Sequence, residues 1–427
     1  MAAEISAAWA PVAAVARAEA GRRITEHFVA EPDRAARFTA TGAGLTLDLS
    51  RARMSEAGRR ALLDFAATRQ VEAARDRMLA GEPVNTTEGR AAHHTALRAD
   101  PTPREVQAEA ARAAAYAEEL RGGGTRAVLW LGIGGSDLGP RMVCDALAAG
   151  ADGPEVRFVS NVDGAALDRA LTGLDPATTR IVVVSKSFST LETMINARSA
   201  RAWMAAALGE AETGQRMAAV SASVEKAQAF GIAPERVFAM WDWVGGRFSL
   251  WSAVGLAIRI ALGNPAFDAL LAGAREMDTH FAEAPLESNL PVLLALSDIW
   301  NVNALGLPSL GICPYADGMG LFVPYLQQLM MESNGKRVGE DGAALPLQGA
   351  PVIWGVPGTD CQHSVFQWMH QSPAEAPAEF LLPVAPEGAR AEHQEALMAN
   401  CLAQASALML GRDRAATAAL GGDPALV

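Results

Sequence analysis

The chain has 427 residues and a formal net charge of −12, so it is long enough to form two domains with sizeable cores. The acidic balance argues against nucleic acid or an anionic membrane surface as a partner, because both need a basic face. Half of the residues are hydrophobic, only 6% are aromatic and Ala is abundant, which favours a helix-rich α/β protein. Because the net charge is negative, an anionic ligand must be captured by a local arrangement of groups.

The sequence predicts a cytoplasmic protein that does not cross a membrane. No apolar run approaches the ~18 residues of a membrane-spanning helix, and the first residues carry Glu4 but no basic stretch, so no signal peptide is expected. The four cysteines lie far apart without CxxC spacing, which is typical of reduced, buried thiols. They are Cys144, Cys313, Cys361 and Cys401.

Residues 1–120 alternate Ala, Arg and Glu with few β-branched residues, which predicts a mainly helical N-terminal region. A capping pattern at residues 85–90 predicts a helix directly after it, holding His93, His94 and Arg98. Adjacent histidines point to different sides of a helix, so this pair is a poor metal site. No other His, Cys or acidic residues show the spacing of metal ligands, and neither a metal nor another cofactor is predicted.

From residue 121 onward, strands are expected to alternate with helices. Such alternation predicts a parallel sheet covered by helices on both faces, and we assign residues 121–260 to a first α/β domain. After a helical connection the pattern resumes, which predicts a second α/β domain at residues 261–427. Strands are expected at 127–133, 156–159, 180–184, 218–220, 236–238, 309–313, 352–355 and 380–384, and later helices at 324–334, 363–371 and 391–410.

A glycine-rich turn at residues 132–140 follows the first predicted strand. It does not match the dinucleotide-binding fingerprint, because Asp137 stands where the third glycine is required. The Ser136 hydroxyl lies at the predicted start of a helix, in a turn rich in backbone N–H groups. This arrangement suits the close approach of a polar ligand, and a purely structural tight turn is an equal alternative.

The strongest local chemistry lies at residues 184–193, directly after an apolar strand and at the start of a helix. Several hydroxyl groups and one ammonium group meet where free backbone N–H groups and the positive end of the helix dipole point outward. One helix cap needs only one hydroxyl, so we favour a phosphate site for a small phosphorylated metabolite. The candidate phosphate ligands are Ser185, Lys186, Ser187 and Thr190.

Lysine is rare in this chain. Of 36 basic residues only Lys186, Lys226 and Lys336 are lysines, so a retained lysine hints at a site that needs a compact point charge. Chance survival is an equal alternative.

A short helix predicted at 324–334 carries a candidate general base. Its apolar residues form a stripe at helical spacing, whereas Gln328 and Glu332, four residues apart, project from another face. A carboxylate beside Met330 and Met331 at the end of a half-buried helix should be partly desolvated, as a general base needs. The alternative is a surface carboxylate on an amphipathic helix.

Two more polar side chains complete the candidate list. Arg247 lies on a turn that begins Gly245-Gly246, where its guanidinium could stabilise an oxyanion or form a salt bridge at a domain edge. His363 begins a predicted helix and could act as an acid or base near neutral pH. An isolated histidine is more often structural.

Taken together, these motifs resemble those of the glucose-6-phosphate isomerase family. The resemblance extends from residues 85–90 to the helix around Leu402, which is nearly the whole chain. The matching motifs lie at 131–140, 184–193, 245–249, 325–336 and 358–371, in the order in which the family has them.

The resemblance implies two sugar-isomerase type domains of doubly wound α/β fold and the reversible conversion of D-glucose 6-phosphate to D-fructose 6-phosphate without a cofactor. It implies that Glu332 moves a proton between C2 and C1 and that Arg247 stabilises the cis-enediolate. His363 would assist ring opening from the partner subunit of a homodimer. Ser185, Lys186, Ser187 and Thr190 would hold the phosphate, Ser136 and Gln328 would contact the sugar, and Glu192 is our own hypothesis for the residue that orients His363.

The chain departs from the family pattern in two ways. The family has a catalytic lysine in a C-terminal segment, whereas no lysine follows Lys336 here, so we expect that segment to be missing. Either the chain is a fragment of a longer protein, or its activity is damaged. The alternative function is a non-catalytic sugar-phosphate-binding protein or an inactive fragment. The smaller changes, Ser187 and Ser189 in place of Thr and Cys361 in place of Gly, should be tolerated.

Overall fold

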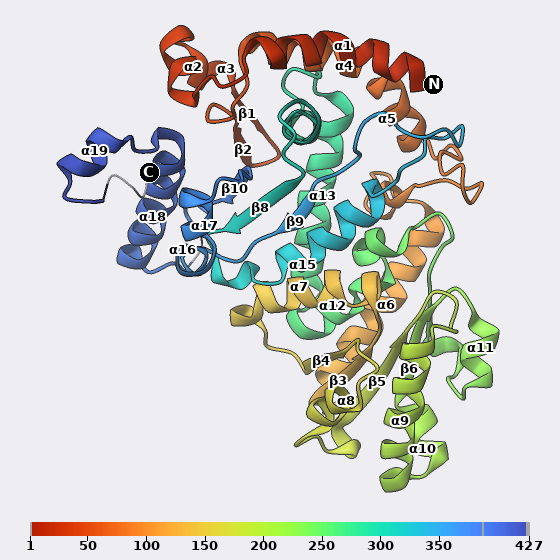
Figure 1. The fold of residues 1–427 in the computed structure, drawn as a ribbon. Coiled ribbons are helices and arrows are strands. Elements are labelled where there is room, and N and C mark those ends of the chain that lie inside the picture. The colour runs from red at the N-terminus through yellow and green to blue at the C-terminus, as the bar shows by residue number, and fades with distance from the viewer. Residues whose placement is uncertain (1, 387, 424–427) are drawn as a thin grey trace. The chain divides into compact units, whose positions relative to one another are not determined.

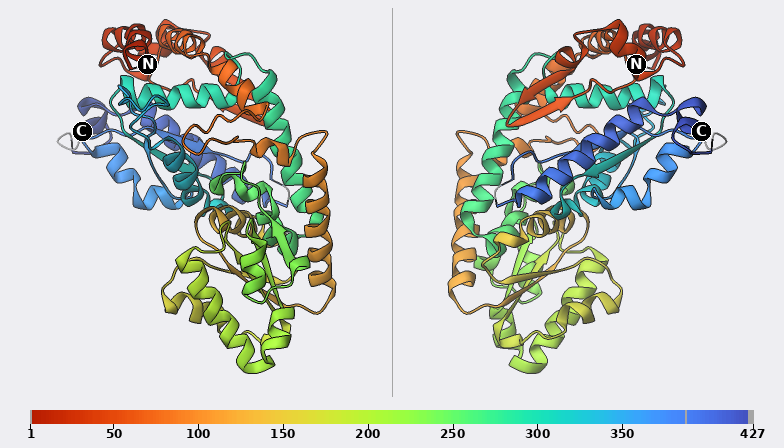
Figure 2. Two further views of the ribbon diagram at one scale, coloured as in Figure 1. Left: turned by 90° about the vertical axis from the view of Figure 1, so that its right-hand side faces the viewer. Right: turned by 90° about the vertical axis from the view of Figure 1, so that its left-hand side faces the viewer.

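The computed structural model describes residues 2–386 and 388–423, and its contacts group into two compact units (Figures 1 and 2). We call Asp76–Asp278 the five-stranded unit, and Met1–Arg75 together with Thr279–Val427 the three-stranded unit. The division predicted from the sequence, into residues 1–120, 121–260 and 261–427, is based on the order of helices and strands along the chain. As a division into functional domains it stays a prediction.

The five-stranded unit is built on a parallel sheet with the strand order β4-β3-β5-β6-β7. From β3 the chain adds β4 on one side of the sheet, and it then adds β5, β6 and β7 on the other side. The direction of strand addition therefore reverses between β3 and β5, as in doubly wound folds. The predicted α/β class is confirmed. The strands are β3 (Ala127–Leu131), β4 (Glu155–Val159), β5 (Thr179–Val184), β6 (Met217–Ser221) and β7 (Val237–Ala239).

The central strands of this sheet are buried on both faces, because helices cover each side. Successive side chains of a strand point to opposite faces, so Trp130 packs with α6 (Arg104–Gly122) and α12 (Leu256–Leu262), whereas Leu131 packs with α9 (Leu191–Leu208). The other helices that lie within or enter this unit are α5 (Val71–Leu79), α7 (Leu138–Ala146), α8 (Gly164–Leu171), α10 (Glu210–Gln215), α11 (Val224–Ala229) and α13 (Asn264–Glu283).

The three-stranded unit has a parallel sheet of order β10-β8-β9 and a separate antiparallel hairpin. Its strands are β1 (Thr39–Gly42), β2 (Leu45–Asp48), β8 (Ser309–Pro314), β9 (Val352–Trp354) and β10 (Ala378–Leu381). Its helices are α1 (Ala2–Ala18), α2 (Ile24–Ala30), α3 (Arg34–Arg37), α4 (Glu56–Thr68), α14 (Leu290–Ile299), α15 (Phe322–Leu326), α16 (Asp360–Ser364), α17 (Phe366–Gln371), α18 (Ala391–Leu410) and α19 (Arg414–Ala419).

The N-terminal stretch is largely helical, but it also forms the hairpin of β1 and β2, which was not predicted. Ala43 and Gly44 both have positive φ, at 47° and 72°, which is the pattern of a two-residue type I′ turn. No helix that is long and apolar enough to cross a membrane occurs in residues 2–386 and 388–423.

The helix predicted directly after residue 90 is wrong. Asn85 and Arg90 form an isolated β-bridge, and the Asn85 side chain accepts the Glu88 N–H at 3.2 Å. The only helical structure there is the 3-10 turn His94–Leu97. Prolines at 101 and 103 interrupt the chain before α6 begins, because proline has no N–H to donate and restricts the residue before it.

Two carboxyl groups interact inside the three-stranded unit, Asp298 on α14 and Glu379 on β10. Asp298 is buried, and its Oδ1 atom has no hydrogen-bond partner among the described residues. Burial raises the pKa of Asp298 to about 7, and burial together with the nearby Asp298 raises the pKa of Glu379 to about 8. Since the unfolded chain releases these protons near pH 4, the folded state holds more protons between pH 4 and 8, and its stability should fall as the pH rises through that range.

We therefore expect Asp298→Asn to stabilise the protein at pH 8.5. Its effect on the free energy of unfolding should be about 2 kcal/mol more favourable at pH 8.5 than at pH 4. The measurement is the midpoint of thermal unfolding at several pH values between 4 and 8.5. Asp64→Asn, at an exposed position of α4, is the matched control and should follow the wild type. If the Asp298→Asn curve runs parallel to the wild-type curve, the carboxyl pair does not set the pH dependence.

Candidate active site

Ser136 lies at the carboxyl end of β3, beside the reversal of strand order where ligands bind in doubly wound folds. It ends a 3-10 turn, Gly134–Ser136, that leads into α7. Gly134 has a φ of +60°, which glycine adopts without strain. The Trp130 indole Nε1–H donates to the Ser136 carbonyl at 2.8 Å, so the buried core fixes this turn.

The hydroxyl loop, residues 185–190, connects β5 to α9 at the same edge of the sheet. The Oγ atom of Ser185 lies 3.1 Å from Oγ1 of Thr190, and Ser189 donates to Ser187 Oγ at 2.8 Å. Thr190 is the residue before the first turn of α9, but its side chain does not cap the helix. The hydroxyl groups therefore cluster beside the N-terminus of an 18-residue helix, where the dipole favours an anion.

Two contacts hold this loop in place. Phe188 is buried and packs edge-on against Phe230, with ring centroids 5.8 Å apart. Lys226 donates through Nζ to the Ser187 carbonyl at 3.0 Å. Both contacts leave the Ser187 side chain exposed, so the loop is fixed without burying its hydroxyl.

Lys186 is bound to protein carbonyl groups in this structure. Its Nζ atom donates to the carbonyls of Asp242 and Val244, each at 3.2 Å, and lies 3.6 Å from the Asp242 carboxylate. Burial, and secondarily the charge of Arg90, lowers its pKa. The ammonium group thus ties the hydroxyl loop to the segment that leads to Arg247, and its predicted role as a phosphate ligand stays a prediction.

The turn that carries Arg247, Gly246–Trp251, packs directly on the Ser136 turn. A Cβ atom at Gly135 would lie 1.9 Å from the Gly246 carbonyl oxygen, so only glycine fits there. Ser249 donates from Oγ to the Gly246 carbonyl at 2.6 Å and lies 3.3 Å from the Gly135 carbonyl. The structure therefore brings the turns of Ser136 and Arg247 together within the five-stranded unit.

In the three-stranded unit, Gln328 and Glu332 lie on a π-helical segment, Gln327–Glu332, that continues α15. The predicted regular α-helix is wrong here, and Pro324 is the third helical residue rather than the first. A turn of a π-helix holds roughly four to five residues, so Gln328 and Glu332 still share a face. π-helical segments are frequent at functional sites.

The burial expected at Glu332 is also wrong. Met330 and Met331 pack against the core formed by Leu310 and Ile353, whereas the Glu332 residue is exposed. The three-stranded unit by itself does not desolvate the candidate base.

His363 is exposed on α16, which follows β9. The preceding residues hold the helix in place, since Cys361 is buried and Gln362 donates from Nε2 to the Tyr315 hydroxyl at 3.1 Å. Glu192 lies in the first turn of α9, in the five-stranded unit, and its pairing with His363 stays a prediction.

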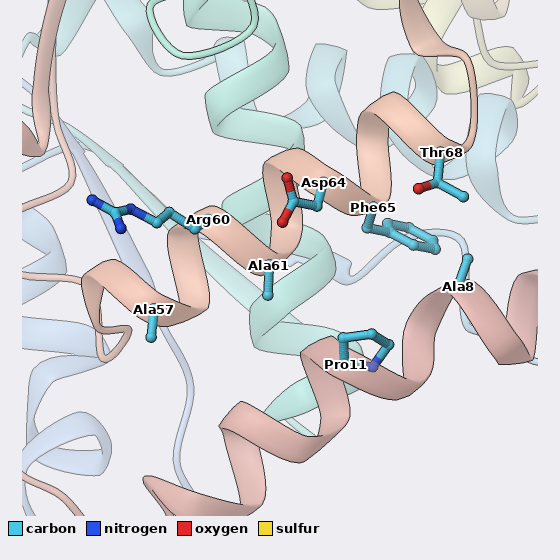
Figure 3. Close-up of a pocket in the computed structure, with 8 residues that line it drawn as sticks. All are labelled: Ala8, Pro11, Ala57, Arg60, Ala61, Asp64, Phe65 and Thr68. Atoms are coloured by element: carbon cyan, nitrogen blue, oxygen red, sulfur yellow. The ribbon is translucent and has the colours of Figure 1, made fainter.

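Two cavities are lined by none of the predicted site residues. A groove of about 490 Å³ runs between α1 and α4, where Pro11, Asp64 and Phe65 are among the residues that line it (Figure 3). A cleft of about 530 Å³ is lined by residues that include Asp360 and His393. Among residues 2–386 and 388–423, no group of three or more His, Cys, Asp or Glu side chains is arranged to hold a metal ion.

Comparison with known proteins identifies the family. The sequence model described as "Phosphoglucose isomerase" matches residues 48–420. The chain belongs to this family. A glucose-6-phosphate isomerase from Caulobacter sp. (strain K31) is 46% identical over 96% of this chain and 79% of that protein. A second one, from Burkholderia multivorans, is 50% identical over 89% of this chain and 73% of that protein.

A solved structure supports the assignment of this chain to the phosphoglucose isomerase family. The crystal structure of a glucose-6-phosphate isomerase from Chlamydia trachomatis superposes with a TM-score of 0.81 at 30% identity, over 95% of this chain and 80% of that chain. The predicted family and fold class are confirmed.

The sequence analysis missed several residues that shape the site. Asp242 and Val244 bind Lys186, and Gly135 allows the two turns to touch. The rarity of lysine did mark Lys226, whose contact with the Ser187 carbonyl is non-local. No local pattern identifies the carbonyl partners of Lys186, because they lie 56 and 58 residues further along the chain.

We expect Gly135→Ala to destabilise the five-stranded unit by about 1–3 kcal/mol, because the added methyl group meets a backbone carbonyl that cannot move aside easily. Thermal unfolding measures the loss, and hydrogen exchange should rise in residues 246–251. Gly164→Ala is the matched control, since nothing lies within 4 Å of its Cβ position. Equal stability of the two variants would contradict the close packing.

Proposed function

We propose that this chain catalyses the reversible isomerisation of D-glucose 6-phosphate and D-fructose 6-phosphate. Membership of the phosphoglucose isomerase family carries the proposal, with relatives of this name at 46% and 50% identity over most of the chain. The reaction moves a proton within one substrate, so it balances without a cofactor. A non-catalytic sugar-phosphate-binding protein is not favoured.

The phosphate group is assigned to the hydroxyl loop. Ser187 is exposed, Ser185 and Thr190 lie with their hydroxyl oxygens 3.1 Å apart, and the N-terminus of α9 is adjacent. Backbone N–H groups and hydroxyl groups can surround phosphate oxygens there while the helix dipole favours their charge. Lys186 would add a positive charge if a phosphate displaced one of its two carbonyl contacts.

The proton transfer is assigned to Glu332 and Arg247. A proton α to a carbonyl is weakly acidic, so its removal needs a positioned base and a fixed positive charge at the developing enediolate oxygen. An arginine suits the second task because it stays protonated. Since Glu332 is exposed on its own unit, bound substrate would have to exclude water from the carboxylate.

Ring opening and sugar contacts complete the proposal. His363, exposed on α16, would protonate or deprotonate the ring oxygens from the partner subunit of a homodimer, and Glu192 would orient it. Ser136 and Gln328 would contact the sugar. The homodimer and a cytoplasmic location stay predictions from the sequence.

An assay that couples formation of fructose 6-phosphate to a reporter enzyme tests the activity directly. We expect Glu332→Gln to lower kcat by about 10²- to 10⁴-fold with a much smaller change in KM, because the amide cannot accept the proton. Glu340→Gln, at an exposed loop position, is the matched control. Wild-type binding of glucose 6-phosphate without turnover would instead support the non-catalytic function.

The phosphate assignment has its own test. We expect Thr190→Val to weaken binding of inorganic phosphate and to raise KM by about tenfold, since a hydrogen bond to a charged group contributes roughly 1.5–3 kcal/mol. Isothermal titration calorimetry with inorganic phosphate gives the affinity. Ser199→Ala, at an exposed position further along α9, should bind as the wild type does. Unchanged affinity in Thr190→Val would refute the assignment.

A further inference from the structure

The segment around Arg247 is contacted by residues 93–98. Before the arginine, the His93 N–H donates to the Trp243 carbonyl at 3.0 Å. Directly after it, the His94 imidazole stacks on the Phe248 ring, with centroids 4.6 Å apart and planes inclined by 21°. The two consecutive histidines therefore contact the chain on both sides of Arg247.

A third contact fixes the far end of the same segment. The Arg98 guanidinium lies 4.7 Å from the Trp251 ring centroid and pairs with the Asp278 carboxylate at 2.6 Å. This anchor and the His93 contact hold the two ends of the segment, and the His94 stack lies between them, on the residue directly after Arg247.

Phe248 links this stack to Arg247. The Arg247 guanidinium carbon lies 5.3 Å from the Phe248 ring centroid, within the range of a cation–π contact. Phe248 thus contacts both the His94 ring and the Arg247 guanidinium. The stack that holds Phe248 therefore bears on the direction of the guanidinium.

The His94 ring is suited to stacking rather than to proton transfer. Burial, and then the nearby Arg98 charge, lowers the pKa of His94 to about 4. The imidazole is therefore neutral near pH 7, and it adds no positive charge beside Arg98.

We propose that His94 is a positioning residue: by stacking on Phe248 it fixes the turn that presents Arg247 to the enediolate. This inference rests on the proposed isomerase function, and it assigns His94 no contact with the substrate. It requires a flat ring at position 94 but no ring nitrogen.

The pair His94→Phe and His94→Leu separates these requirements. Both lack the ring nitrogens, and only phenylalanine can stack. We expect His94→Leu to lower kcat about tenfold with KM for glucose 6-phosphate within twofold, and His94→Phe to keep kcat within about threefold of the wild type. A loss of kcat in both variants would mean that His94 acts through its nitrogens. Wild-type kcat in His94→Leu would mean that the His94 side chain has no part in orienting Arg247. Either result overturns the inference.

Ligand binding gives a second measurement that does not depend on turnover. The probes are inorganic phosphate and a phosphorylated five-carbon hydroxamate, whose hydroxamate group mimics the enediolate. We expect His94→Leu to bind phosphate as the wild type does and the hydroxamate about tenfold more weakly. Equal losses for both probes, or no loss for either, would contradict a role through Arg247.

The same experiments distinguish failure of the two proposals. If the wild-type chain does not convert glucose 6-phosphate, the proposed activity fails, and the hydroxamate affinities still decide whether His94 orients Arg247. If the wild type is active and His94→Leu matches it in kcat and in hydroxamate affinity, only the role of His94 fails. Comparison of the thermal unfolding midpoints of the variants excludes simple loss of folding.

Discussion

The packing of Gly135 against the Gly246 carbonyl is the constraint on which the site in the five-stranded unit depends. Any side chain at position 135 would overlap that carbonyl group, so the absence of a Cβ atom sets how closely the turn after β3 and the Arg247 turn approach each other. Ser249 also joins the two turns, because its hydroxyl donates to the Gly135 carbonyl at 3.3 Å. The Arg247 turn and the Ser136 turn are thereby packed against each other at the carboxyl edge of the sheet.

The proposed phosphate site relies on local arrangement, because the chain as a whole has a net charge of −12. The hydroxyl loop offers neutral donors at a helix N-terminus. Two of the three lysines are associated with it: Lys186 is part of the loop, and Lys226 contacts it. Lys226 binds the Ser187 carbonyl and Lys186 binds the carbonyls of Asp242 and Val244. These ammonium groups therefore organise the backbone around the proposed phosphate site.

Regular, strongly patterned elements could be predicted from the sequence alone. The helix expected at 391–410 is α18, and all eight expected strands exist within a few residues of their predicted bounds, because buried strands and amphipathic helices have clear apolar periodicities. The π-helical segment at Gln327–Glu332 and the missing helix after residue 90 could not be predicted in this way. In both places non-local packing and proline, rather than periodicity, decide the backbone.

The sequence by itself determined the family, the α/β class and the identity of the candidate residues, because each of these is carried by residue types at fixed spacing along the chain. Only the tertiary structure decided what those residues touch. The carbonyl partners of Lys186, the exposure of Glu332 and the stack of His94 on Phe248 all join segments far apart in sequence or depend on which face of an element meets the core. Such contacts leave no local pattern, since they are set by the folding of the whole unit.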